Sequence, residues 1–446
     1  MKIKNIKVKK LFGFLNKDLN FYEDMTLLVG INGAGKTSLL NLINWVLTPS
    51  INNLCATNFE KVTLTIDFKG KEYKLVCTNN KKEFKYEIIT DNHEFHPLKV
   101  NIRHNYNNNN LDEVVELYSN LGPDEEEVLT WQFIQELPKP TIIGLDRSLY
   151  TETSDSIYID DSKIRNKSSL RQNLIPKSPS IRVKELLNKE YRINKNKILN
   201  LTNNLKNQIM LSAFEAGVDG NSLINEKSYK IHLNQISVTK KRVKDYFENF
   251  EKNSFDSNQL LIIDKYFDNL ENITKKYENS SDNITRILYN LNANQFSKTI
   301  KLLREFEKFE KETNNALHKI NTFLETINLF FKDSNKILVF KEETSEIFFH
   351  TTDFNGNLIT KFNDIKFLSS GEEQILVLFA YIAFSEMKNK IFIIDEPELS
   401  LHLRWQESFI SQLEKVLDEN NQIILATHSP ILVGNKKDKA VVIMPE

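Results

Sequence analysis

Hydrophobic and polar residues alternate along the first part of the chain, a pattern typical of β-strands with one buried face. Residues 2–21 alternate on both sides of Gly13 and predict two antiparallel strands, and the apolar run Met25–Val29 predicts a buried strand after them. Three further alternating runs, separated by turn residues, predict a β-meander. These three runs lie at residues 62–68, 73–78 and 84–89.

Apolar residues then change to helical spacing. Residues 111–121 and 125–137 are expected to form helices, and residues 141–145 a short buried strand. The polar stretch 150–180 is expected to be a loop or linker. Residues 181–332 contain few prolines or glycines and predict an all-helical insertion whose apolar stripes form its own core or a helix–helix seam.

Strand patterns return near the end of the chain. Residues 336–340, 347–352 and 358–362 predict strands, with an Asn355-Gly356 turn before the last of them. A helix at 375–384, buried strands at 391–394 and 422–426, and a final strand at 440–444 are expected to follow. The chain therefore predicts an α/β fold in three parts, an N-terminal lobe (1–150), a helical insertion (151–335) and a C-terminal lobe (336–446).

Length and charge narrow the possible functions. The chain has 446 residues, too many for one compact core, and its net charge is −1. Such a balance gives no whole-molecule attraction to nucleic acid or anionic membranes, so any such contact needs a local patch. Cys55 and Cys77 match no metal-binding spacing and are expected to be buried or incidental thiols. No apolar run approaches a membrane span, so we expect a cytoplasmic protein without a membrane partner.

A glycine-rich loop follows the predicted strand Met25–Val29 directly. Such loops point backbone N–H groups at phosphate oxygens, and the following helix adds positive charge at its N-terminus. Lys36 is expected to contact the β- and γ-phosphates, and the Thr37 hydroxyl to bind Mg²⁺. The chain is therefore expected to bind a nucleoside triphosphate. The residues predicted to hold it are Asn32, Gly33, Ala34, Gly35, Lys36, Thr37 and Ser38.

Two carboxylates, Asp395 and Glu396, follow the predicted strand 391–394. The carboxyl end of a parallel strand is where open α/β sheets place catalytic groups. Asp395 is expected to hold Mg²⁺ directly or through water, and Glu396 to act as the general base for the water that attacks the γ-phosphate. Taken alone, this pair is also compatible with a plain strand end.

Two more polar segments accompany this pair. Leu368-Ser369-Ser370-Gly371-Glu372-Glu373-Gln374 opens a predicted helix, and it is either an anion site or an ordinary helix cap. His428 follows the predicted strand 422–426 and is either a ligand of a terminal phosphate oxygen or a surface residue.

The order of these segments resembles that of the ATP-binding-cassette (ABC) ATPases. Residues 368–374 look like the family's signature motif, Ser400-Leu401-His402 like its D-loop, and His428 like its switch histidine. The resemblance implies an ABC-type P-loop ATPase head, with a mixed sheet, an antiparallel β subdomain and a large all-helical insertion. It also implies ATP and Mg²⁺ as cofactors, and Lys36, Glu396 and His428 as catalytic residues.

In that family the signature motif of one chain closes over the nucleotide of another. The resemblance therefore implies at least a homodimer. Gln132 and Gln135 lie near the position of the family's Q-loop glutamine, and each is either that metal contact or a helix-surface residue. The residues implied to act in trans are Ser369, Ser370, Gly371 and Glu372.

The distance between motifs indicates a branch of this family. Thr37 and Leu368 are 368 − 37 = 331 positions apart, which excludes a simple transporter subunit. A long helical insertion is similar to that of the RecF and structural-maintenance-of-chromosomes groups. The run Asp395-Glu396-Pro397-Glu398-Leu399-Ser400-Leu401-His402 looks most like the overcoming-lysogenization-defect ATPases and anti-phage ATPase subunits such as PtuA of Septu and AriA of PARIS.

This resemblance implies an ATPase subunit of a bacterial anti-phage complex that controls a separate effector, a Toprim-like or HNH nuclease. The trigger, nucleic acid or a phage protein, stays open, and the alternative is a RecF- or SMC-like ATPase for DNA repair or chromosome maintenance. The chain ends soon after its last predicted strand, so we expect no Toprim domain within it. Asp91-Asn92-His93 with His96 loosely resembles an HNH nuclease, but turn and surface residues are the favoured interpretation.

Overall fold

The computed structural model divides into two compact units. One, here called the head, comprises Met1–Tyr191 and Lys319–Glu446, and the other, the helical unit, comprises Arg192–His318. The linker predicted at residues 150–180 lies almost wholly outside the described residues. The structure describes residues 1–91, 95–104, 111–118, 121–143, 149–150, 179–214, 232–250, 257–279, 282–384, 390–434 and 436–444.

An antiparallel sheet of six strands forms one layer of the head, in the order β2-β1-β4-β5-β6-β7. Alternating burial along β1 and β4 reflects the alternating sequence, because successive side chains point to opposite faces of the sheet. The predicted strand pair and meander are confirmed, and β7 is a strand that the sequence did not predict. The strands are β1 (Lys2–Leu11), β2 (Leu15–Asn20), β4 (Lys61–Phe68), β5 (Lys71–Asn79), β6 (Glu83–Ile89) and β7 (Leu98–Asn101).

A second six-stranded sheet crosses the centre of the head, in the order β15-β3-β14-β13-β8-β9. All neighbouring pairs are parallel except β8 and β9, so the sheet is mixed. Every residue of β13 and β14 is buried, which explains why these strands read as continuous apolar runs. The strands are β3 (Met25–Val29), β8 (Thr141–Ile143), β9 (Leu149–Tyr150), β13 (Ile391–Asp395), β14 (Gln422–Thr427) and β15 (Ala440–Val442).

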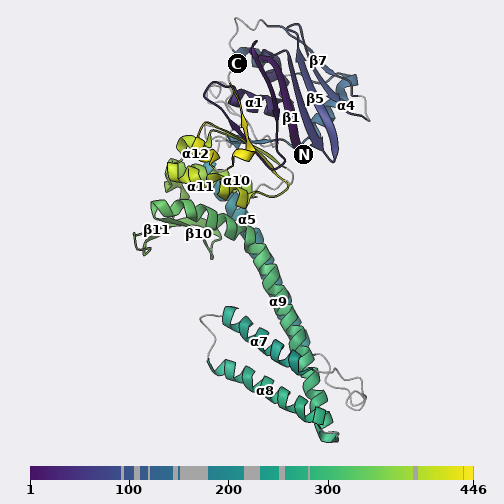
Figure 1. Ribbon diagram of the computed structural model, residues 1–446, viewed down its shortest axis with the longest axis vertical. Coiled ribbons are helices and arrows are strands. Elements are labelled where there is room, and N and C mark those ends of the chain that lie inside the picture. Colours follow the sequence, from purple (N-terminus) through teal and green to yellow (C-terminus); the bar gives the residue numbers. More distant parts are fainter. Residues whose placement is uncertain are drawn as a thin grey trace, which may run out of the picture. The chain divides into compact units, whose positions relative to one another are not determined.

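Helices cover both faces of this central sheet. Helix α1 (Lys36–Leu47) packs in one core with the antiparallel sheet, and the hydroxyl of Tyr86 donates a 3.0 Å hydrogen bond to the carbonyl of Val46. The opposite face packs against α10 (Ser370–Phe384), α11 (Leu403–Val416) and the last turns of α9 (Asn283–Phe331). Helices α10, α11 and α12 lie together in Figure 1. The motif-bearing strands are thereby held between two layers.

A small antiparallel sheet, in the order β10-β11-β12, comes before α10 in the sequence. It comprises β10 (Lys336–Lys341), β11 (Glu346–Thr352) and β12 (Leu358–Asn363), and Gly356 adopts a φ of 83° in the predicted turn. The remaining short elements of the head are α2 (Ile51–Ala56), α3 (Leu111–Leu117), η1 (Glu125–Glu127), α4 (Val128–Glu136), η3 (Lys332–Ser334), η4 (Ile365–Phe367), η5 (Pro397–Ser400), α12 (Pro430–Val433) and η6 (Lys437–Lys439).

The described residues of the helical unit are almost all helical. Helices α7 (Leu233–Phe250) and α8 (Ser257–Asn279) run side by side in Figure 1 and share a core with part of α9. Phe267 of α8 and Phe296 of α9 are fully buried in that core. Helix α5 (Pro179–Phe214) and α9 both continue from the head into this unit.

The fold class predicted from the sequence is confirmed: an α/β head with a mixed sheet and an antiparallel β subdomain, together with a large helical region. Among the described helices, none has the length and apolar character needed to cross a bilayer.

Candidate functional site

The glycine-rich loop joins the end of β3 to the start of α1. Gly33 and Gly35 have φ angles of 83° and 90°, a region that residues with a Cβ atom rarely adopt. A Cβ atom on Gly30 would lie 2.6 Å from the carbonyl oxygen of Ile443, so the loop requires glycine there for space. Asn32 and Gly33 are exposed to solvent, whereas Ala34 is buried beneath them.

Lys36, the first residue of α1, is 3% exposed. Its Nζ donates hydrogen bonds to the carbonyl oxygens of Gly30 (2.9 Å) and Ile31 (3.2 Å). It also lies 3.8 Å from Oε1 of Glu396. The ammonium group is thus held against the loop and beside the carboxylate predicted to be the general base.

Thr37 and Asp395 meet directly. The Thr37 hydroxyl donates a 2.7 Å hydrogen bond to Oδ2 of Asp395, which is the last residue of β13. Burial raises the pKa of Asp395, although the hydrogen bond from Thr37 opposes this shift. The other oxygen, Oδ1, is buried and has no hydrogen-bond partner among the described residues. A hydroxyl beside a carboxylate with a spare oxygen fits the oxygen-donor preference of Mg²⁺.

Glu396 has φ 47° and ψ 55°, the left-handed region that residues other than glycine rarely adopt. Such strained backbone persists where surrounding structure enforces it, frequently at functional sites. The Glu396 N–H donates a 2.9 Å hydrogen bond to the carbonyl of Ala426. Its Oε1 lies 3.7 Å from Nδ1 of His428, the residue that directly follows β14. The parallel register of β13 and β14 therefore brings Glu396 and His428 together.

A residue not singled out by the sequence reasoning also contacts His428. Oε1 of Glu398 lies 3.2 Å from His428 Nδ1, and the Glu398 side chain is 3% exposed. The sequence carried a signal for it, because Glu398 lies within the Asp395–His402 run that resembles the overcoming-lysogenization-defect ATPases.

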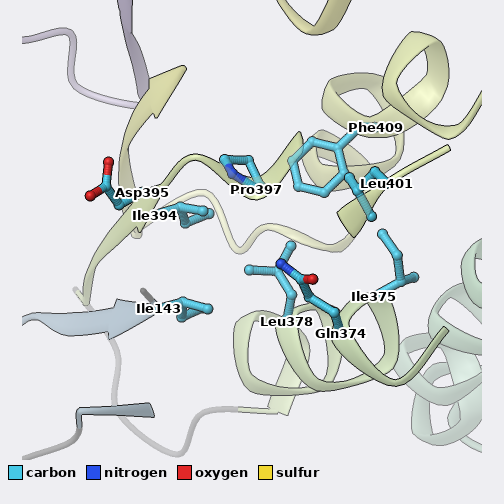
Figure 2. Close-up of a pocket in the computed structure, with 9 residues that line it drawn as sticks. All are labelled: Ile143, Gln374, Ile375, Leu378, Ile394, Asp395, Pro397, Leu401 and Phe409. Atoms are coloured by element: carbon cyan, nitrogen blue, oxygen red, sulfur yellow. The ribbon is translucent and has the colours of Figure 1, made fainter. Parts of the chain in front are cut away.

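The signature-like segment lies at the start of α10. Figure 2 shows Gln374, Ile375 and Leu378 of α10 around one small pocket with Ile394 and Asp395 at the end of β13. Oε1 of Gln374 is buried and, within the described residues, has no hydrogen-bond partner. The start of α10 is thereby packed close to the strand that carries Asp395.

The four predicted signature residues differ in exposure. Ser369 and Ser370 are exposed and Gly371 is half-buried, so these three are available to a second molecule. Glu372 is only 2% exposed. Its Oε2 forms a 2.7 Å ion pair with Nζ of Lys336 and accepts a 2.7 Å hydrogen bond from the Ser369 N–H. The carboxylate of Glu372 is therefore engaged within its own chain and shapes the signature turn.

Gln132 and Gln135 both lie exposed on α4. No hydrogen bond between either glutamine and Thr37 or Asp395 is present in the described part of the chain, so which of them acts as a Q-loop residue stays a prediction. In the HNH-like segment, Asn92 and His93 lie outside the described residues, and His96 is exposed. The described residues contain no group of three or more His, Cys, Asp or Glu able to hold a metal ion.

Cys55 and Cys77 are both buried, and no disulfide joins them. Burial raises the pKa of the Cys55 thiol to about 12 and that of Cys77 well above its ordinary value. Both thiols are buried, as predicted, and burial disfavours the reactive thiolate form.

Several proteins are similar to this chain. The Retron Vc95 probable ATPase of Vibrio cholerae serotype O1 biovar El Tor is 26% identical over 217 residues, which cover 44% of this chain and 40% of the relative. The DNA double-strand break repair Rad50 ATPase of Methanococcus maripaludis is 25% identical over 301 residues, or 64% of this chain and 26% of that protein. The chain thus spans well under two thirds of the length of these curated relatives.

Similar solved structures include the Smc head domain of Pyrococcus furiosus with an extended coiled coil, bound to the C-terminal domain of ScpA. It is 12% identical, with a TM-score of 0.36 and coverage of 97% of this chain and 91% of that chain. The SMC head domain from Thermotoga maritima has the same identity and TM-score, with coverage of 99% and 94%.

The family described as the AAA ATPase domain matches residues 1–433, nearly the whole sequence. The match includes the glycine-rich loop, the Asp395-Glu396 strand end and His428, which the structure brings into one site. The chain therefore belongs to the AAA ATPase domain family.

Proposed function

We propose that this protein binds and hydrolyses ATP as an ABC-class subunit of a cytoplasmic bacterial anti-phage complex. In this proposal, two heads dimerise around ATP, and their nucleotide state controls a separate effector protein. The proposed effector is a Toprim-like or HNH nuclease. The observation that carries the ATPase part is the hydrogen bond between Thr37 and Asp395, which joins the phosphate loop to the carboxylate strand. Glu396 follows Asp395 in the chain, and its Oε1 lies 3.8 Å from Nζ of Lys36 and 3.7 Å from Nδ1 of His428.

The roles of the residues follow from this arrangement. The loop backbone and Lys36 bind the phosphates of ATP. Thr37 and Asp395 hold Mg²⁺, which when bound neutralises phosphate charge. Glu396 orients a water molecule and accepts its proton as the water attacks the γ-phosphate, and His428 binds an oxygen of that phosphate. The products are ADP and inorganic phosphate.

The ATPase part is tested with Glu396→Gln and Lys36→Ala. Glu396→Gln removes the proton acceptor but keeps a hydrogen-bonding group of the same shape, so turnover should be lost while ATP binding remains. Lys36→Ala should weaken binding itself. Glu407→Gln, at an exposed position of α11, is the matched control. Hydrolysis by Glu396→Gln at the wild-type rate would remove Glu396 from the general-base role.

Two observations support the role in defence. The run from Asp395 to His402 resembles the overcoming-lysogenization-defect ATPases and the anti-phage subunits PtuA and AriA, and the chain is similar to a retron ATPase. This role is tested by infecting cells with phage and measuring phage yield. The cells carry either the wild-type gene region or the same region with Glu396→Gln. Equal phage yield with and without the intact gene region would reject it. Co-purification from the same cells identifies the effector and shows whether a phage protein or nucleic acid is the trigger.

The similarity to a Rad50 ATPase favours a second candidate, a DNA repair or chromosome-maintenance ATPase. This candidate requires a DNA-facing surface on the dimer, which the net charge of −1 does not supply by itself. It predicts that duplex DNA stimulates hydrolysis at physiological salt, whereas the defence proposal predicts stimulation or inhibition by a partner protein.

A further inference from the structure

The side chain of Glu398 is buried in the turn η5, directly after the catalytic pair. A buried carboxylate needs hydrogen-bond donors, and those that the described residues supply to Glu398 come from one segment, Thr427–Ser429. Oε1 of Glu398 accepts hydrogen bonds from the Thr427 hydroxyl (2.6 Å), the His428 N–H (2.8 Å) and the Ser429 N–H (3.2 Å). One oxygen atom thus fixes the backbone that carries the switch-like histidine.

The same oxygen also orients the histidine ring. His428 Nδ1 lies 3.2 Å from Oε1 of Glu398 and 3.7 Å from Oε1 of Glu396, so this ring nitrogen faces the two carboxylates. A carboxylate beside one ring nitrogen sets the orientation of the imidazole and leaves the other nitrogen available for a ligand. Glu398 is therefore placed to hold Nδ1 on the protein side, while Nε2 stays available for a phosphate oxygen.

A second polar link joins the same two segments. Gln406 of α11 is 7% exposed. Its Oε1 accepts a 2.7 Å hydrogen bond from the Ser429 hydroxyl, and its Nε2 donates to the carbonyls of Leu401 (3.0 Å) and Glu398 (3.4 Å). The turn after Glu396 and the segment after β14 are therefore connected at two points, which limits independent movement of either.

This arrangement is not explained by stability alone. Oε2 of Glu398 is buried and has no hydrogen-bond partner in the described residues. A buried oxygen without a partner is destabilising, and such groups in folded proteins commonly have a functional reason. The hydrogen bonds of this carboxylate within the described residues are thus concentrated on Oε1, the oxygen that faces Thr427–Ser429.

We infer that Glu398 is a positioning residue for ATP hydrolysis, which acts by holding the ring and backbone of His428 in place, and that Gln406 supports it. This inference rests on the proposed ATPase function. Glu398 does not exchange a proton with the substrate and does not contact it; its effect passes through His428.

Shortening the side chain tests this inference. Glu398→Asp keeps the charge but withdraws the oxygen from Thr427 and His428, and Glu398→Gln keeps an oxygen at the same reach. We expect Glu398→Asp to lower kcat about tenfold, within the range seen for residues that orient a functional histidine, with little change in KM for ATP. Glu398→Gln should retain most of the wild-type kcat. A lower rate for Gln than for Asp would show that charge, not position, matters.

A double-mutant comparison separates positioning from a general structural effect. In a His428→Ala background, Glu398→Asp should lose its effect on kcat, because the residue that it positions is gone. If Glu398→Asp lowers kcat by the same factor with and without His428, Glu398 does not act through His428. Glu407→Gln is the control for an acidic residue of the same chain outside this network.

A readout independent of turnover separates this inference from the proposed function. Crystal structures of wild type and Glu398→Asp should show the His428 ring displaced in the variant. An unchanged ring would overturn the inference whatever the hydrolysis rates are. A different outcome would reject the ATPase proposal alone. In it, the wild type hydrolyses ATP no faster than Glu396→Gln, but the His428 ring is displaced in Glu398→Asp, so the positioning contact still stands.

Discussion

The Thr37 hydroxyl donates a 2.7 Å hydrogen bond to Oδ2 of Asp395, although the two residues are 358 positions apart in sequence. Thr37 lies in the first turn of α1 and Asp395 at the end of β13. The helical unit lies between them in the chain, so the head must assemble from both ends of the sequence. The site is consequently a product of the central sheet, in which β14 separates β3 from β13.

The first prediction concerns Mg²⁺. Asp395→Asn replaces a carboxylate oxygen by an amide nitrogen, which is a poor ligand for a hard cation. We expect Mg²⁺ to raise the ATP affinity of the wild-type protein. In Asp395→Asn, this Mg²⁺-dependent increase in affinity should be at least about tenfold smaller. Titration of a fluorescent ATP analogue with Mg²⁺ or with EDTA measures this difference. An undiminished Mg²⁺ effect in the variant would exclude Asp395 as a ligand.

The second prediction concerns action in trans. Ser369 and Ser370 are exposed at the start of α10, where a second head can reach them. Lys36→Ala and Ser369→Arg should each abolish hydrolysis. A mixture forms heterodimers with one intact composite site, so part of the activity should return unless turnover requires both sites. Full activity of either variant as a demonstrated monomer would contradict the arrangement.

The third prediction concerns the Lys336–Glu372 ion pair beneath the signature turn. Removing one partner leaves the other charge uncompensated in a largely buried place, so Glu372→Gln should lower the free energy of unfolding by about 3 kcal/mol. Glu343→Gln, at an exposed position, is the control. Denaturant unfolding at neutral pH measures the loss, and equal stability of the two variants would show that the pair contributes nothing.

The pH dependence of this difference follows from the pKa of Glu372. Burial alone raises that pKa, but the hydrogen bonds from Lys336, Ser334 and the Ser369 N–H, with the charge of Lys336, outweigh it, and the pKa falls below its ordinary value of 4.5. A carboxyl with a lowered folded-state pKa stabilises the protein fully above 4.5 and loses that contribution as pH falls through the folded value. The stability difference between wild type and Glu372→Gln should therefore shrink in acid. A difference that grows in acid would contradict this sign.

The fourth prediction concerns the helical unit. Val183 and Phe330 are fully buried in the head core, so removal of the whole stretch 181–332 would damage the head itself. Replacing Arg192–His318 with a Gly/Ser linker should instead preserve ATP binding. We propose that the helical unit binds the partner protein of the complex, so co-purification of the partner and protection against phage should be lost in this variant. Partner binding by the shortened protein would place recognition on the head.

The sequence by itself determined the elements whose signals are local. The glycines of the phosphate loop, the alternating strands of the antiparallel sheet and the apolar runs of β13 and β14 are each set by neighbouring residues, so their type could be predicted. The order of motifs was sufficient to indicate Lys36, Asp395, Glu396 and His428 as one site. Strand β7 was missed because its four residues, Leu98-Lys99-Val100-Asn101, alternate over too short a run to stand out as a strand.

Only the tertiary structure decided which polar residues are buried and which atoms meet. The sequence presents Glu372 as one more signature residue, whereas packing of α10 against β10 buries it beside Lys336. Glu398 likewise reads as a turn residue until the register of β13 and β14 places it under Thr427 and His428. Contacts of this kind depend on strand order and on packing between segments distant in the chain, and no local pattern of residues encodes them.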